Sequence, residues 1–393
     1  MSLRDSHEAS RPSTDPELEL ELNSEGGTFS GFVAEDDSPN SFDHFYELTG
    51  LSKDEWHLDK ESLTVRMWQQ SKRTDNGDRD LVWLRSYGGK LIRSDRPELT
   101  QEDIASLLSI GRRYPKTRYK KVKEQTRVAV VTDLQVGKRD RLGGTPELIA
   151  RVANTFDKLS DVMAENPSKR ALIADPGDII EGFENTSSQQ FTNDLSLPEQ
   201  LRVARSILTD IVTGIASKHD HTTVATCPSN HGAWRRGKGS LGRPGDDFGI
   251  DVHMSVKEAL ARDPRYQNVE WVIPESLWEE ITYVEEYGHE IALVHGHQAR
   301  NGKFEDFWRK QAGTFSKAHS TDIVISGHFH TFVAQALGIN SKGNERLHVQ
   351  SSTMDNGSSW WSNISGDMSK PGIVTFLIDE DGWHDLRFIS SDI

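Results

Sequence analysis

Residues 128–136 read Val128-Ala-Val-Val-Thr-Asp-Leu-Gln-Val136. An apolar run with strand character ends there in an acid, Asp133, and an amide, Gln135, follows two residues later. Four later stretches repeat this pattern of an apolar run followed by Asp, Asn or His: 171–178, 222–231, 291–297 and 322–330. Side chains that follow the carboxyl ends of neighbouring strands in an α/β sheet converge on one crevice. The five stretches therefore predict an α/β domain with one cluster of metal ligands.

The length and composition predict a soluble protein with one large and one smaller domain. A chain of 393 residues can bury an ample core. No apolar run approaches the roughly 18 residues of a membrane-spanning helix, and the first residues lack an apolar signal segment. The single cysteine, Cys227, excludes an intrachain disulfide and is typical of a reducing compartment. We therefore expect a cytoplasmic protein without a membrane partner.

The net charge of -15 is distributed unevenly. Residues 1–40 contain ten acids and two arginines, and their composition buries too little apolar area to offset the entropy of ordering. We expect this acidic tail to be disordered. Residues 112–127 contain eight basic residues and one acid. This basic stretch, which overlaps the linker predicted at 111–126, is either a solvated connection or a contact for a phosphate backbone.

Residues 41–110 are predicted to form a small α+β module. Phe42 to Leu48 has the pattern of a short helix that Ser41 caps. Two strand-like runs, 63–68 and 81–87, flank Asp75-Asn-Gly-Asp78, and Asn-Gly between such runs is a strong hairpin signal. The aromatic residues either form the core of this module or recognise a substrate; the tryptophans concerned are Trp56, Trp68 and Trp83.

Residues 127–393 alternate between strand and helix patterns. Helices are expected from Thr145 to about Val162, from Leu197 to about Lys218 and from Phe248 to Ala261. Residues 281–294 have the pattern of a hairpin that turns at Tyr287-Gly288, and strand-like runs continue from Phe332 to Ile389. This order of elements is typical of a domain built from βαβ units.

The strand-end residues of this domain resemble those of the calcineurin-like metallophosphoesterase superfamily. The motifs, in chain order, are Asp133-x-Gln135, Gly177-Asp178, Asn230-His231, His295-Gly-His297 and Gly327-His-x-His330. Each motif alone is weak, but five in this order, each after an apolar run, form a strong signal. The resemblance covers roughly residues 126–393. It implies a four-layer α/β/β/α sandwich of two mixed sheets and hydrolysis of phosphate esters.

The resemblance also implies a site for two divalent metal ions. Such a pair acidifies a water molecule and clamps the phosphoryl group under attack. By the family pattern, Asp178 bridges the two ions, Asp133 and His330 bind one of them, and Asn230, His295 and His328 bind the other. His231 follows a ligand without being one, and its expected role is to protonate the leaving oxygen.

Three positions differ from the family pattern. Gln135 stands where the family usually has histidine, and it either binds the first ion weakly through its amide oxygen or only donates and accepts hydrogen bonds. Oxygen-rich coordination favours Mn²⁺, or Mg²⁺, over Zn²⁺. Ser229 replaces a glycine, and Gly232 replaces an acid that could orient His231. Glu181 either supplies that missing carboxylate or is an ordinary acid at a helix start.

The loop after His231 is the predicted substrate contact. Trp234 could stack on a base while Arg235 and Arg236 bind phosphates, or the loop is a solvated basic surface with Trp234 packed inward. The favoured function is hydrolysis of DNA phosphodiesters, because the sequence of residues 133–138 resembles that of phage-encoded members of the superfamily. Such members act in the host cytoplasm. A phosphomonoesterase, a small-molecule phosphodiesterase and a non-catalytic binding protein are the alternatives. No segment indicates a coiled-coil ATPase partner.

Overall fold

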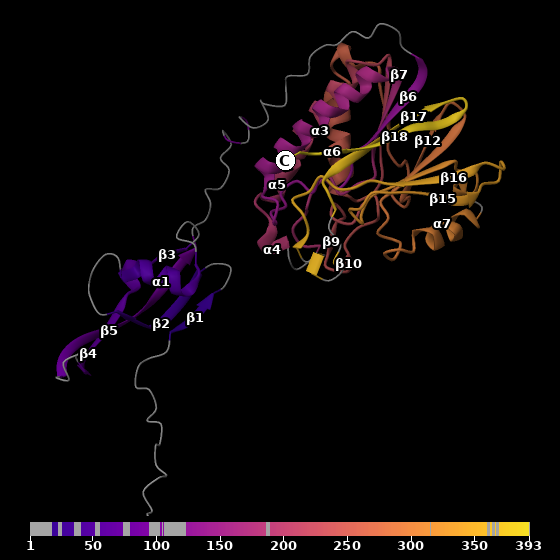
Figure 1. Ribbon diagram of the computed structural model, residues 1–393. Helices are drawn as coiled ribbons and strands as arrows, with labels where there is room; N and C mark the ends of the chain where they lie inside the picture. Colours follow the sequence, from indigo (N-terminus) through magenta and orange to yellow (C-terminus); the bar gives the residue numbers. More distant parts are fainter. Residues whose placement is uncertain are drawn as a thin grey trace, which may run out of the picture. The chain divides into compact units, whose positions relative to one another are not determined.

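The computed structural model describes residues 18–22, 26–34, 41–51, 56–73, 79–93, 103, 105, 123–185, 189–314, 316–359, 362–363, 366 and 369–392. The chain divides into two compact units, Met1–Glu98 and Leu99–Ile393 (Figure 1). Within the described residues, no helix has both the length and the apolar character needed to cross a membrane.

The N-terminal unit is one antiparallel sheet with a helix packed on it. Its elements are β1 (Glu19–Leu22), β2 (Gly26–Ala34), α1 (Ser41–Thr49), β3 (Trp56–Leu58), a 3-10 turn η1 (Lys60–Ser62), β4 (Thr64–Arg73) and β5 (Arg79–Arg93). The strands lie in the order β1-β2-β5-β3, and β4 also pairs with β5. The register runs from Thr64 opposite Gly88 to Arg73 opposite Arg79, which confirms the predicted hairpin. Its turn, 74–78, lies outside the described residues.

The predicted disorder of residues 1–40 is wrong for the part that the structure describes. Strands β1 and β2 lie within that range and belong to the sheet. The reason is that Phe29 and Phe32 are buried against Phe45 of α1, so this part of the tail does contribute to a core. The module therefore begins before residue 41. Trp56 is buried, which agrees with the core role among its two expected roles, and Trp68 is half-buried. The Trp83 side chain and most of the basic linker lie outside the described residues.

The second unit is a mixed α/β domain, as predicted. Its helices are α3 (Thr145–Glu165), α4 (Gln189–Thr192), α5 (Leu197–Ala216), α6 (Phe248–Leu260) and α7 (Phe304–Ala312), with 3-10 turns η2 (Pro264–Tyr266) and η3 (Lys317–His319). A six-stranded sheet has the order β11 (Val269–Val272), β8 (His221–Thr226), β7 (Ser168–Asp175), β6 (Lys123–Val130), β17 (Gly372–Asp379) and β18 (Gly382–Ser390).

A five-stranded sheet has the order β12 (Ile281–Glu286), β13 (His289–Val294), β14 (Ile323–Ser326), β16 (Glu345–Gln350) and β15 (Val333–Ile339). A small hairpin pairs β9 (Arg235–Arg236) with β10 (Gly239–Ser240). The three predicted helices are confirmed. So is the predicted hairpin of β12 and β13, in which Tyr287 and Gly288 hold positive φ values of 51° and 82°.

Three hydrophobic clusters hold the layers of this unit together. Apolar residues of α3, α5 and α6 pack on one face of the six-stranded sheet. The opposite face, through Val128 and Leu172, packs against Leu293 and Ile325 of the five-stranded sheet. Helix α7 covers the far face of the five-stranded sheet with Phe304 and Trp308. Figure 1 shows α3, α5 and α6 together on one side of the domain, with α7 close to β15 and β16.

The parallel strands direct their carboxyl ends to the functional loops. Strands β6, β7 and β8 are parallel neighbours in one sheet, and β13, β14 and β16 are parallel neighbours in the other. The loops after these strands carry the predicted residues at 133–135, 178, 230–231, 295 and 328–330. Because both sheets present these ends together, the loops meet in one cluster.

Candidate metal centre

Two carboxylates, Asp133 and Asp178, lie at the centre of the cluster. They are 0% and 1% exposed, and both have left-handed backbones, with φ of 52° and 55°. Asp133 Oδ1 and Asp178 Oδ2 are buried and accept no hydrogen bond. Each oxygen faces a histidine nitrogen: His330 Nε2 lies 3.2 Å from Asp133 Oδ1, and His295 Nε2 lies 2.9 Å from Asp178 Oδ2.

The loop of Gly327 and His328 approaches Asp133 very closely. The backbone N–H of His328 donates to Asp133 Oδ2 over 3.0 Å. A Cβ atom at Gly327 would lie 2.3 Å from the same oxygen, so a side chain there would displace the carboxylate. His328 itself has φ of 69°. Glycine in this motif is therefore required by the close approach of the two loops.

His295 is oriented so that one ring nitrogen faces the site. Its Nδ1 lies 2.9 Å from the carbonyl oxygen of Pro176, and its Nε2 lies 2.8 Å from Asn230 Oδ1. Burial alone would lower the pKa of His295, but the Asp178 carboxylate outweighs burial and raises the pKa to about 9. Positive charge is therefore favoured at the position where Asn230, Asp178 and His295 converge.

A divalent metal ion fits this arrangement. When the neutral His295 ring donates its Nδ1–H to the Pro176 carbonyl oxygen, its Nε2 carries a lone pair. Asn230 Oδ1 and Asp178 Oδ2 then face that lone pair with no proton between them. Ligand atoms of Asp178, His295 and His328 lie within 4.8 Å of one another. Imidazole, carboxylate and amide ligands together suit a transition-metal ion. The orphaned Asp178 oxygen is satisfied if such an ion lies there.

Asp133 and His330 form a second group of predicted ligands, in which His330 Nε2 lies 3.2 Å from Asp133 Oδ1. His330 Nδ1 lies 3.4 Å from Asp355 Oδ2, which directs the opposite ring nitrogen toward Asp133. Asp355 is fully buried and paired with Lys138, whose Nζ lies 2.5 Å from the same Oδ2. Burial alone would raise the pKa of Asp355, but Lys138 and His330 hold it well below its usual range. Asp355 is therefore a charged positioning group for His330.

Gln135 makes the hydrogen bonds expected for the second of its two predicted roles, in which its side chain does not bind metal. Its Oε1 accepts a hydrogen bond of 2.7 Å from Lys138, and its Nε2 lies 3.4 Å from His231 Nε2. Direct binding of metal by Gln135 remains a prediction. Asp133, Asp178, Asn230, His295, His328 and His330 are brought together as the sequence motifs require.

His231 lies against Asp178 and a second carboxylate, Glu181. Its backbone N–H donates to Asp178 Oδ1 over 2.7 Å, and its Nδ1 lies 3.0 Å from Glu181 Oε2. Burial lowers the pKa of the ring, but Glu181 and Asp178 outweigh burial and raise it to about 9. Residue 181 lies outside any helix, so its role as a helix-start acid is excluded. Glu181 supplies the orienting carboxylate that Gly232 lacks.

The loop after His231 divides into residues near the site and residues bound elsewhere. Arg235 is half-buried, and its Nε–H donates to no partner within hydrogen-bond distance among the described residues. Burial lowers the pKa of Arg235, and Asp178 opposes that effect. Arg236 instead pairs with Glu184 at 3.0 Å and is exposed. Trp234 is 56% exposed, so its side chain is not packed inward.

Two residues of the site, Asp355 and Lys138, were not selected from the sequence. Asp355 follows β16 in the same way that the predicted ligands follow their strands. The run Leu347-His-Val-Gln350 was a detectable strand signal, but four residues separate its end from the acid. Lys138 gave no signal, because its partners Gln135 and Asp355 are three and 217 residues away.

Comparisons with other proteins give structural likeness only. No protein-family model and no curated protein matches the sequence. Among solved structures, a predicted phosphoesterase from Streptococcus pneumoniae shares 11% identity, with a TM-score of 0.27, and the match covers 68% of this chain and 91% of that one. A metallophosphoesterase from Sphaerobacter thermophilus shares 10% identity, with a TM-score of 0.29 and coverage of 68% and 90%.

The sulfate thiohydrolase SoxB from Thermus thermophilus, in complex with glycerol, shares 11% identity, with a TM-score of 0.30 and coverage of 69% and 57%. Identities and TM-scores this low do not establish what the chain does.

Proposed function

We propose that this chain is a metal-dependent phosphoesterase of the calcineurin-like superfamily that hydrolyses phosphodiester bonds, with DNA as its substrate. The observation that supports this most is the convergence of two buried carboxylates and three histidines, with two carboxylate oxygens left without hydrogen bonds. A cluster of this kind is costly to bury without cations. Layers of helices, two sheets and a further helix agree with the four-layer sandwich of that superfamily.

The proposed metal ligands divide into two groups that share Asp178. Asn230, His295 and His328 would hold one divalent ion, and Asp133 and His330 would hold the other. Bound Mn²⁺, or Mg²⁺, supplies Lewis acidity that activates water and neutralises phosphoryl oxygens. Asn185 donates to the backbone carbonyl of Asn230 over 2.7 Å, which steadies the loop that carries this ligand.

His231 is the proposed acid for the leaving oxygen. Glu181 and Asp178 favour its protonated form, since they raise its pKa to about 9. Its Nδ1 lies 2.9 Å from the Glu181 carbonyl oxygen and 3.0 Å from Glu181 Oε2, so Nδ1 carries a proton and is held in place. The Nε2 proton is then directed toward the cluster and can pass to the leaving group.

DNA is supported by the loop that follows His231. Arg235 brings a guanidinium whose charge interacts with Asp178, and this position suits a phosphate bound at the cluster. The neighbouring Trp234 exposes more than half of its surface and can stack on a base.

The single cysteine, Cys227, is buried and unpaired, which agrees with the proposed reducing cytoplasm.

The test is Mn²⁺-dependent cleavage of linear double-stranded and single-stranded DNA, alongside a chromogenic diester and a chromogenic monoester. We expect DNA cleavage by the wild-type protein, and its loss in Asp178→Ala and His231→Ala. The matched control is His384→Ala, because that histidine lies on β18 and its side chain is 43% exposed. Cleavage of only the small esters would replace the nuclease assignment by a small-molecule phosphoesterase. The absence of hydrolysis with any metal would overturn the enzymatic proposal.

A further inference from the structure

Four exposed apolar side chains lie in two loops beside the proposed metal centre. Trp234 and Leu241 belong to the loop that follows His231, here called the Trp234 loop. Leu277 and Trp278 belong to the loop that joins β11 to β12, here called the Trp278 loop. Trp278 is 73% exposed, the largest exposure among these four residues, which we call the tryptophan rim. Large apolar side chains exposed together are a common feature of binding sites.

The two loops of the rim touch each other. The Gly245 N–H of the Trp234 loop donates to the Leu277 carbonyl oxygen over 2.9 Å. A Cβ atom on Gly245 would lie 2.8 Å from the Leu277 Cα, so the two backbones are in close contact. Within the Trp234 loop, the Trp234 N–H donates to the Asp246 carbonyl oxygen, directly after Gly245, over 3.0 Å. Both tryptophans are therefore carried by one connected surface.

The Trp278 loop lies at the edge of the sheets where the proposed metal ligands lie. Strand β11 is parallel to β8, so the carboxyl ends of both strands point to this edge. Strand β12 then begins opposite the last residue of β13, directly before His295. In addition, Gln298, in the loop that His295 begins, donates to Glu280 Oε2 over 2.8 Å. Trp278 is thus held beside the loops that carry the proposed metal ligands.

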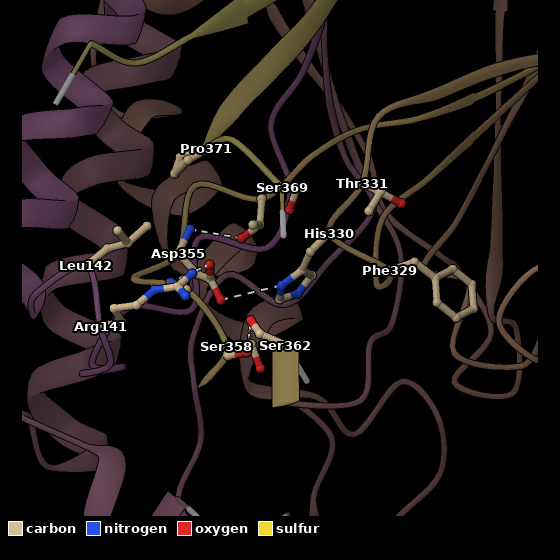
Figure 2. A pocket seen from close by; sticks show the side chains of 12 residues that line it. Arg141, Leu142, Phe329, His330, Thr331, Asp355, Ser358, Ser362, Ser369 and Pro371 are labelled. Atoms are coloured by element: carbon tan, nitrogen blue, oxygen red, sulfur yellow. Dashed lines mark hydrogen bonds and ion pairs between the residues drawn. The ribbon is translucent and has the colours of Figure 1, made fainter. Parts of the chain in front are cut away.

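The cavity beside the cluster is too small for a base. Figure 2 shows this cavity, which His330 and Asp355 line together with other residues. Its volume is about 30 Å³, which is enough for a few water molecules. A nucleobase near the cluster therefore does not fit this cavity, whereas the rim offers exposed aromatic faces that a base can contact.

The charges around the rim differ between its two loops. The Trp234 loop carries Arg235, whose Nε–H donates to no partner among the described residues, and the exposed Lys238. Trp278 instead lies next to Glu279 and close to Glu275, and both of these acids are exposed. Phosphates are attracted by the first loop and repelled by the second. A flat uncharged group, such as a nucleobase, is therefore the part of DNA that suits Trp278.

We propose that the tryptophan rim binds unpaired nucleobases, so that the DNA substrate is single-stranded where it meets the site. The inference rests on the proposed function and specifies the class of DNA. Bases of a duplex are paired and stacked on one another, and only their edges reach the grooves. Their faces are then closed to a tryptophan side chain. A single strand exposes those faces, and stacking on aromatic side chains is the main way in which proteins bind it.

Three fluorescein-labelled ligands of equal length test this proposal: a single-stranded oligothymidylate, an abasic strand with the same sugars and phosphates, and a blunt duplex. Fluorescence anisotropy gives their Kd values with Mn²⁺ in the His231→Ala protein, which is expected to bind DNA without cleaving it. Adding Trp278→Ala should raise the Kd of the oligothymidylate about tenfold and leave the other two unchanged. Trp278→Phe keeps an aromatic face and should restore most of the affinity.

The matched control is Trp383→Ala in the same background. Trp383 is also exposed, but it pairs with Ile378 of β17, which in turn pairs with Thr126 in the amino-terminal half of β6. It therefore lies at the edge of the sheet opposite the metal centre, and its replacement should change none of the three Kd values. Because Trp278 is mostly exposed, replacing it removes no core contact.

The outcomes separate this inference from the proposed function. An unchanged Kd of the oligothymidylate in Trp278→Ala would overturn the inference, as would an equal loss of affinity for the abasic strand. Tighter binding of the duplex than of the single strand, or no binding of any ligand, would also overturn it. Hydrolysis of the chromogenic diester by the wild-type protein is measured separately. If no metal supports that hydrolysis while Trp278→Ala still loses the single strand, the enzymatic proposal fails and the rim assignment stands.

Discussion

Replacement of Lys138 by methionine should be among the most destabilising single changes in the second unit. Lys138 is 7% exposed and Asp355 is 0% exposed, so their ion pair is buried. The variant keeps the aliphatic length but removes the ammonium that bonds Asp355 Oδ2 and Gln135 Oε1 over 2.5 and 2.7 Å. Asp355 would keep the hydrogen bond from the Gly357 N–H but would lose its cation. Loss of one partner from a buried pair costs about 3–5 kcal/mol.

Urea unfolding of four proteins measures this cost: wild type, Lys138→Met, Asp355→Leu and the double variant. We expect the double variant to be more stable than Lys138→Met, because no buried charge is then left unpaired. The matched control is Lys158→Met, whose partner Asp392 is 70% exposed, and its expected cost is below about 1 kcal/mol. A cost for Lys138→Met that is no larger than this control would refute the argument, as would strict additivity of the two single changes.

Three further predictions concern metal, pH and the acid. Mn²⁺ at one hundred times its Kd should raise the free energy of unfolding of the wild-type protein by about 2.7 kcal/mol, which is measured as a higher unfolding midpoint. Asp178→Ala should abolish this shift, and an equal shift in both proteins would contradict the proposed site. Burial lowers the pKa of His348 from 6.5 to about 3, so below pH 6.5 the unfolded chain binds a proton that the folded chain does not. As the pH drops below 6.5, the free energy of unfolding should therefore fall by up to about 1.4 kcal/mol per pH unit. The fall should be less steep in His348→Gln, and parallel pH profiles of the two proteins would count against this prediction. Glu181→Gln should lower kcat about tenfold or more with little change in KM, whereas an unchanged kcat would remove Glu181 from the mechanism.

The convergence of the strand-end residues could be predicted because their pattern is local. Each one follows an apolar run within a few residues, as Asp133 follows β6 and Asp178 follows β7. Convergence of the carboxyl ends of parallel strands then brings distant segments together without any knowledge of the tertiary contacts. The hairpins were predictable for a related reason, since Asn-Gly and Tyr-Gly turns act over two to four residues.

The groups that support the proposed ligands could not be predicted in the same way. Lys138 and Asp355 are paired only because the loops after β6 and β16 are held together by Arg151. Arg127 belongs to the basic stretch at 112–127, yet it is 1% exposed and pairs with Asp385 at 3.2 Å. Its part in a phosphate contact is excluded by that burial. The Lys138–Asp355 and Arg127–Asp385 pairs both place a charged residue inside the protein, whereas composition alone assigns charged residues to the surface.

The backbone of the cluster argues that its geometry is maintained for function. Five residues of the three motifs after β6, β7 and β14 have positive φ, between 44° and 69°: Asp133, Gln135, Asp178, His328 and His330. This conformation costs a non-glycine residue roughly 1–2 kcal/mol, and glycine would avoid that cost. The strain is held by hydrogen bonds between the loops themselves, in which Asp133 N–H donates to Gly177 O, Gln135 N–H to Asp178 O and His328 N–H to Asp133 Oδ2. Side chains that persist at such positions are retained for what they bind, because stability alone would favour glycine there.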